Sequence, residues 1–84
     1  MTNEALIEKL KEIVKPYVKN EEGFNNLNEN TGFLNDLKIN SANLVDVILD
    51  IETEFDILID NDSMEKMLNV KAAMEIINIK LAEK

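Results

Sequence analysis

Residues 41–55 read SANLVDVILDIETEF, a segment in which apolar side chains recur three and four positions apart. This spacing predicts an amphipathic helix that begins at Ser41 and ends at Glu54 or Phe55, because residues three or four apart share one helix face. The stripe that we expect to be buried consists of Leu44, Val47, Ile48, Ile51 and Phe55. The polar stripe on another side consists of Asn43, Asp46, Asp50 and Thr53, with Val45 and Leu49 at its edge. A helix of this kind needs neighbouring elements to cover its apolar face.

The N-terminal segment predicts a first helix that begins at about Thr2 or Asn3, either of which is an acceptable cap. Its apolar residues at helical spacing are Leu6, Leu10, Ile13 and Tyr17, flanked by Ile7, Val14 and Val18. Pro16 lacks an N–H and clashes with the preceding turn, so we expect this helix to kink or weaken near Lys15.

Two more helices are predicted after residue 60. Asp62 and Glu65 stand three positions apart and match a capping box, which should open a short helix that ends near Leu68. Asn69 can then cap a last helix. That helix carries the apolar residues Val70, Ala73, Met74, Ile76, Ile77 and Leu81. Residues 57–59 form a short apolar connection, for which a short strand is an alternative interpretation.

Residues 20–40 are rich in Asn and predict a long loop between the first two helices. It should lie across the bundle, because five of its apolar residues need burial: Phe24, Leu27, Phe33, Leu34 and Leu37. With two Gly and one Pro in 84 residues, the chain has little material for hairpins. We therefore predict one all-α domain over residues 1–84, a small four-helix bundle of three longer helices and one short helix.

The composition excludes several classes of function. The chain holds no Cys and no His, which removes thiol nucleophiles, imidazole bases and the usual zinc ligands. We therefore expect neither an enzyme nor a metal site. No apolar run approaches membrane-spanning length, and no signal peptide is evident, so we expect a soluble cytoplasmic protein. A net charge of −8 disfavours nucleic acid and points to partners with basic patches.

The acidic residues concentrate in residues 39–65, which hold eight of the seventeen acids and no Lys or Arg. These acids are Asp46, Asp50, Glu52, Glu54, Asp56, Asp60, Asp62 and Glu65. They suit a docking surface for cationic partners, but a solvated helix face would have the same composition. Calcium binding of the EF-hand type is excluded, because neither Asp56 nor Asp60 opens a loop with the required ligand spacing and glycine.

Residues 36–77 read DLKINSANLVDVILDIETEFDILIDNDSMEKMLNVKAAMEII. This segment resembles the acyl carrier protein family, whose pattern has an Asp-Leu-Gly-Ala-Asp-Ser-Leu entry to an acidic helix ending in Glu-Glu-Phe. The positions in register are Asp36, Leu37, Ser41, Val45, Asp46, Glu52, Glu54, Phe55, Asp56, Ile57, Ile59, Glu65, Lys66, Val70 and Ala73. The chain departs from the pattern at Asn40 for Asp, Ala42 for Leu, Lys38 for Gly and Asp60 for Pro.

The resemblance implies that Ser41 carries a 4'-phosphopantetheine arm, taken from coenzyme A by a holo-carrier synthase or another phosphopantetheinyl transferase. The arm would hold an acyl or aminoacyl group as a thioester, in fatty acid, polyketide or other lipid metabolism. Asn40 stands where the family has an Asp that is thought to assist the metal-dependent transfer. Both serines also fit ordinary helix starts, Ser41 as a cap and Ser63 within the capping box.

The resemblance also implies two surfaces on a monomeric carrier. The expected docking residues for acyl-transferring and acyl-modifying enzymes are Ala42, Val45, Asp46, Leu49, Glu52 and Glu54. The expected lining of an acyl pocket is Phe33, Leu34, Ile51, Ile59, Met67 and Ala73, although each of these equally suits an ordinary core. An alternative function is a helical adaptor that keeps the carrier fold, is never modified and acts only through protein–protein contacts.

Overall fold

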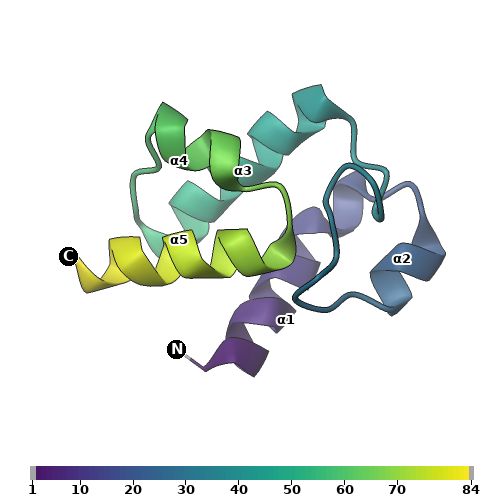
Figure 1. The fold of residues 1–84 in the computed structure, drawn as a ribbon, viewed down its shortest axis with the longest axis horizontal. Helices are drawn as coiled ribbons and strands as arrows, with labels where there is room; N and C mark the ends of the chain where they lie inside the picture. Colours follow the sequence, from purple (N-terminus) through teal and green to yellow (C-terminus); the bar gives the residue numbers. More distant parts are fainter. Residues whose placement is uncertain (1, 84) are drawn as a thin grey trace.

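The computed structural model describes residues 2–83 and is helical throughout its regular elements (Figure 1). The elements in chain order are α1 (Asn3–Val14), the 3-10 turn η1 (Lys15–Tyr17), α2 (Glu21–Asn25), α3 (Ser41–Phe55), α4 (Asn61–Lys66) and α5 (Val70–Ala82). The predicted all-α bundle is confirmed, and α3 has the predicted bounds. Within the described chain, residues 57–59 form no strand, and the only β-type pairing is an isolated bridge between Gly32 and Asn69.

Three of the helix ends follow their local sequence signals. Thr2 caps α1 by accepting a hydrogen bond from the Ala5 N–H at 3.1 Å. Asn69 caps α5 in the same way through the Ala72 N–H at 2.8 Å. The α-helical hydrogen bonding of α1 ends at Val14, and the tighter η1 turn contains Pro16. The predicted break near Lys15 is therefore confirmed.

The predicted cap of the short helix is wrong. Asp60 rather than Asp62 is the N-cap of α4, and its Oδ1 accepts the Ser63 N–H at 2.9 Å. Starting the helix two residues earlier leaves Asp62 in the first turn, where a carboxylate still faces the positive end of the helix dipole. The helix ends at Lys66 and not near Leu68.

The segment between α1 and α3 contains a helix that the sequence did not predict. Helix α2 has only five residues, and the Asn20 side chain at its N-cap makes no capping hydrogen bond. It packs instead against the loop beside it, so closely that a Cβ added to Gly23 would collide with the Asp36 carbonyl oxygen. The Asn20 side chain also donates to that oxygen at 2.8 Å. Helix α2 therefore depends on tertiary contact with the loop.

The hydrophobic core joins α1, α3, α5 and the loops between them. Its buried members are Leu6, Leu10, Val14, Phe33, Leu37, Ile39, Leu44, Val47, Ile48, Ile51, Phe55, Ile57, Ile59, Met67, Val70, Ala73, Met74 and Ile77. The entire predicted stripe of α3 is among them. Phe24 and Leu27 are partly buried against this cluster. Leu34 is an exception to the expected burial, because it is 37% exposed between the inward-facing Phe33 and Leu37.

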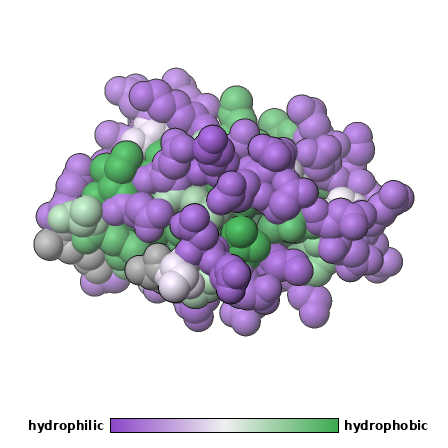
Figure 2. All heavy atoms as spheres, turned by 60° about the horizontal axis from the view of Figure 1, so that its bottom comes forward, coloured by the Kyte–Doolittle hydropathy of each residue, from purple (hydrophilic) through white to green (hydrophobic). Residues whose placement is uncertain are grey.

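The face shown in Figure 2 is mainly hydrophilic, with apolar patches between the hydrophilic residues. The exposed large apolar residues are Leu34, Val45, Leu49, Leu58, Leu68 and Ile79. In residues 2–83, no helix combines the length and the apolar character needed to cross a membrane.

Candidate functional site

Ser41 is the first residue of α3, and its side chain is exposed. The preceding Asn40 caps the helix: its Oδ1 accepts the Ala42 N–H at 2.8 Å, and its carbonyl oxygen accepts the Leu44 N–H at 2.9 Å. The interpretation of Ser41 as the cap is therefore wrong. Among the described residues, the Ser41 hydroxyl has no hydrogen-bond partner and is open to chemistry from outside.

Ser63 has a different environment. Its N–H donates to Asp60, and its side chain is only partly exposed. Hydrogen bonds from the Ser63 hydroxyl and then from its N–H hold the pKa of Asp60 below its usual range. Ser63 therefore serves the start of α4, as the sequence indicated.

The start of α3 suits an anionic group. No acidic residue lies in its first turn, and the unpaired N–H groups of a helix start present partial positive charge. A phosphodiester on Ser41 would lie at this positive end of the helix, and no carboxylate in the first turn would repel it. The residues present thus fit a phosphopantetheine attachment, with Ser41 as the attached residue and Asn40 as its structural support. Within residues 2–83, no group of three or more Cys, His, Asp or Glu is arranged to hold a metal ion.

The outward side of α3 continues from Ser41 as a stripe of four exposed residues: Ala42, Val45, Asp46 and Leu49. Val45 is 44% exposed and Leu49 is 51% exposed, so the edge position expected for both is correct. Spacings of three and four residues place these side chains along one face of the helix. This face offers an apolar centre with one carboxylate.

Two of the acids expected on the docking surface are engaged within the chain. The Glu54 carboxylate forms a 2.7 Å ion pair with Lys9 of α1. Glu52 is partly buried, and its Oε2 accepts the Ile59 N–H at 2.7 Å. Glu52 therefore holds the connection that follows α3, a role that sequence reasoning missed because the partner is a backbone group seven residues away. Asp50 likewise accepts the Tyr17 hydroxyl at 2.9 Å.

The expected acyl-pocket residues divide into two groups. Phe33, Ile51, Ile59, Met67 and Ala73 belong to the buried core. Leu34 lies at the surface. The buried five are part of one apolar cluster with the rest of the core, and Ile59 also lines a surface hollow between the end of α3 and α5.

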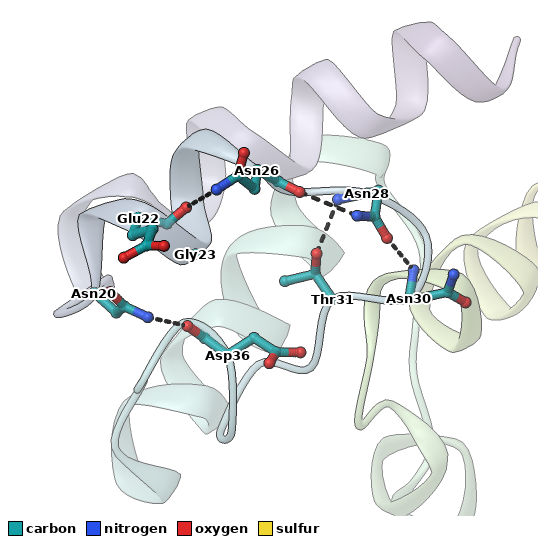
Figure 3. Close-up of a pocket in the computed structure, with 8 residues that line it drawn as sticks. All are labelled: Asn20, Glu22, Gly23, Asn26, Asn28, Asn30, Thr31 and Asp36. Atoms are coloured by element: carbon teal, nitrogen blue, oxygen red, sulfur yellow. Dashed lines mark hydrogen bonds between the residues drawn. The ribbon is translucent and has the colours of Figure 1, made fainter.

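A polar hollow between α2 and the following loop is a feature that the sequence did not single out. Figure 3 shows its lining: Asn20, Glu22, Gly23, Asn26, Asn28, Asn30, Thr31 and Asp36. The amide side chains mainly hold the loop itself. The Asn28 N–H donates to the Thr31 hydroxyl, and the Asn28 side chain accepts the Asn30 N–H, both at 2.8 Å (Figure 3). We interpret this network as structural.

The fold and the site define a small helical bundle that exposes a serine at the start of an acidic amphipathic helix. Comparison with curated proteins identifies relatives of the same size. The acyl carrier protein of Petrotoga mobilis is 32% identical over 81 residues, which cover 96% of this chain and 93% of that protein. The acyl carrier protein of Lactobacillus acidophilus is 34% identical over 77 residues, covering 92% and 94%.

A shorter match, to the acyl carrier protein of Buchnera aphidicola, is 41% identical over 51 residues, covering 61% of this chain and 65% of that protein. No protein-family model matches the chain. The two longer matches nevertheless extend over almost all of the sequence at more than 30% identity. The chain belongs to the acyl carrier protein family.

Proposed function

We propose that this protein carries an acyl or aminoacyl group as a thioester on a 4'-phosphopantetheine arm attached to Ser41. The proposal is based on the arrangement at the start of α3, where one residue caps the helix and the next presents a free hydroxyl. Asn40 caps the helix, and the exposed Ser41 hydroxyl is left without a partner among the described residues. The membership of the carrier family adds weight, because an accessible serine at this register is what attachment requires.

The chain itself supplies position rather than catalysis. Ser41 has no general base in contact with it, since the chain contains no His and no described residue hydrogen-bonds to the Ser41 hydroxyl. Activation therefore belongs to a separate phosphopantetheinyl transferase with coenzyme A. When bound, the arm supplies a thiol that forms the thioester. The helix start holds the phosphodiester, and we propose that the protein works as a monomeric, single-domain cytoplasmic carrier that is not an enzyme.

Enzymes that use the cargo would dock on the exposed stripe of α3. Val45 and Leu49 offer the apolar contact, and Asp46 offers a carboxylate to a basic partner. Glu52 and Glu54 contribute negative potential to the same region, although each already has a partner within the chain. Exposed charges of this kind mainly accelerate association.

The mass of the intact protein tests the attachment. The purified chain is incubated with coenzyme A and each of several phosphopantetheinyl transferases. We expect the mass to increase by one phosphopantetheine group in the wild type and in the Ser63→Ala variant. The Ser41→Ala variant should show no increase. An increase that survives Ser41→Ala would contradict the proposal.

The second candidate function is an unmodified adaptor, which the changes at Asn40 and Ala42 favour. Both flank Ser41, where a transferase must bind. Failure of every transferase to modify the wild type, with the fold intact by circular dichroism, would support the adaptor and overturn the carrier.

A further inference from the structure

Lys38 has an unusual backbone conformation close to the proposed attachment site. Its φ of 57° lies in the left-handed region, which glycine adopts freely and which residues with a Cβ rarely adopt. Its two neighbours explain how it is held there. Leu37 and Ile39 are both buried, and their N–H groups donate to the carbonyl oxygens of Gly32 and Phe33. With both neighbours anchored in the core, Lys38 is forced outward and is exposed.

Non-glycine residues in this strained conformation cluster at functional sites. Lys38 precedes Ser41 by three residues, which places the two Cα atoms within about 11 Å of each other. Among the described residues it forms no ion pair. Residues 39–65 contain no Lys or Arg, and no acid occupies the first turn of α3. Lys38 is therefore the cation nearest to Ser41 along this part of the chain.

We infer that Lys38 forms an ion pair with the phosphodiester on Ser41, an inference that rests on the proposed function. Asn40, which lies between the two in the sequence, is neutral and its side-chain oxygen accepts the Ala42 N–H, so it offers no carboxylate to compete for the Lys38 ammonium. The phosphodiester then lies between the Lys38 ammonium and the N–H groups of the helix start. Lys38 is a positioning residue that orients the arm at its point of attachment.

The test compares unfolding by urea, which adds no salt, for the unmodified and the modified protein. Both forms are measured for the wild type, Lys38→Gln and Lys38→Gly, and their modification state is verified by intact mass. For each variant, the quantity compared is the unfolding equilibrium constant of the modified form divided by that of the unmodified form. An exposed ion pair should make this ratio about twofold to fivefold smaller in the wild type than in Lys38→Gln. Moderate salt should reduce this difference.

Lys80→Gln is the matched control, because it removes the same charge from α5, beside the C-terminal end of α3. Lys80 lines the same hollow as Glu52 and residues 56–60. Along the α3 axis, Glu52 is about 16 Å from Ser41. The ratio between modified and unmodified forms should remain at its wild-type value in this variant.

Each outcome bears on the ion pair. Loss of the difference in both Lys38 variants, with Lys80→Gln unchanged, would support it. A wild-type ratio in Lys38→Gln would overturn it, and so would a loss confined to Lys38→Gly, which would indicate a backbone effect. An equal loss in Lys80→Gln would also overturn it by showing that any charge suffices. If no transferase modifies the protein, the mass measurement rejects the proposed function. The ion pair is then rejected as well, because there is no phosphodiester for Lys38 to bind.

Discussion

Replacement of Glu52 should destabilise the fold, although the sequence places this residue among exposed docking acids. The Glu52 carboxylate accepts the Ile59 N–H at 2.7 Å, and its backbone carbonyl accepts the N–H groups of Asp56 and Ile57. Glu52 therefore holds the chain where it turns from α3 toward α4. Ile59 is only 7% exposed, so its N–H has little access to water when the carboxylate is removed.

The size of the effect follows from the type of hydrogen bond. A bond to a charged group contributes about 1.5–3 kcal/mol, and an unsatisfied buried donor costs about 1–3 kcal/mol. Because Glu52 remains partly exposed, we expect the lower part of this range, about 1.5–2 kcal/mol, for Glu52→Ala. Glu52→Gln keeps an acceptor oxygen and should lose about half as much, since charge-assisted bonds are roughly twice as strong as neutral ones. For a domain of this size, the Ala variant should melt about 6–16 °C lower.

Urea unfolding followed by circular dichroism measures this free energy, and Asp46→Ala provides the control. Asp46 is exposed, lies on the same helix and has no hydrogen-bond or ion-pair partner among the described residues. Its replacement should change the free energy of unfolding by less than about 0.5 kcal/mol. If Glu52→Ala and Asp46→Ala were equally stable, Glu52 would be an ordinary surface acid that does not anchor the Ile59 N–H. A confirmed loss would make Asp46 the better probe of docking.

Three further measurements test other parts of the structure. Gly23→Ala places a Cβ against the Asp36 carbonyl and should cost about 1–3 kcal/mol in urea unfolding. Gly32→Ala adds a Cβ that makes only ordinary van der Waals contacts, so it should cost much less; equal losses would contradict the close packing of α2. The pKa of Asp60 is lowered in the folded state, so its contribution to stability is present above its unfolded pKa and disappears as the pH falls through the folded pKa. Thermal melts across acidic pH should therefore vary less with pH in Asp60→Asn, and an unchanged profile would argue against this assignment. In surface plasmon resonance with a cognate transferase, Asp46→Lys should slow association and Leu49→Ala should mainly speed dissociation; a core-like stability loss for Leu49→Ala would show that it is not a docking residue.

The sequence alone was sufficient where several local signals agree over many residues. Helix α3 combines a complete apolar stripe with Asn40 and Ser41 at its start, so its bounds and its buried face were both predictable. The caps Thr2 and Asn69 and the break near Pro16 were predictable for the same reason, because each acts on backbone groups within one turn. The register of Ser41 with the carrier family came from the sequence as well, and the structure adds that its side chain is exposed.

The tertiary structure decided the features that depend on residues brought together from a distance. Helix α2 is too short to be stable alone, and it forms where Gly23 lets it approach the Asp36 carbonyl. The role of Glu52 was hidden because its partner, the Ile59 N–H, reaches it only after the chain reverses at Asp56, whose φ is 52°. The local sequence around an acidic residue does not indicate whether its side chain faces solvent or a backbone donor. Packing makes that choice, because it determines which N–H groups lose their water and must find a partner in the protein.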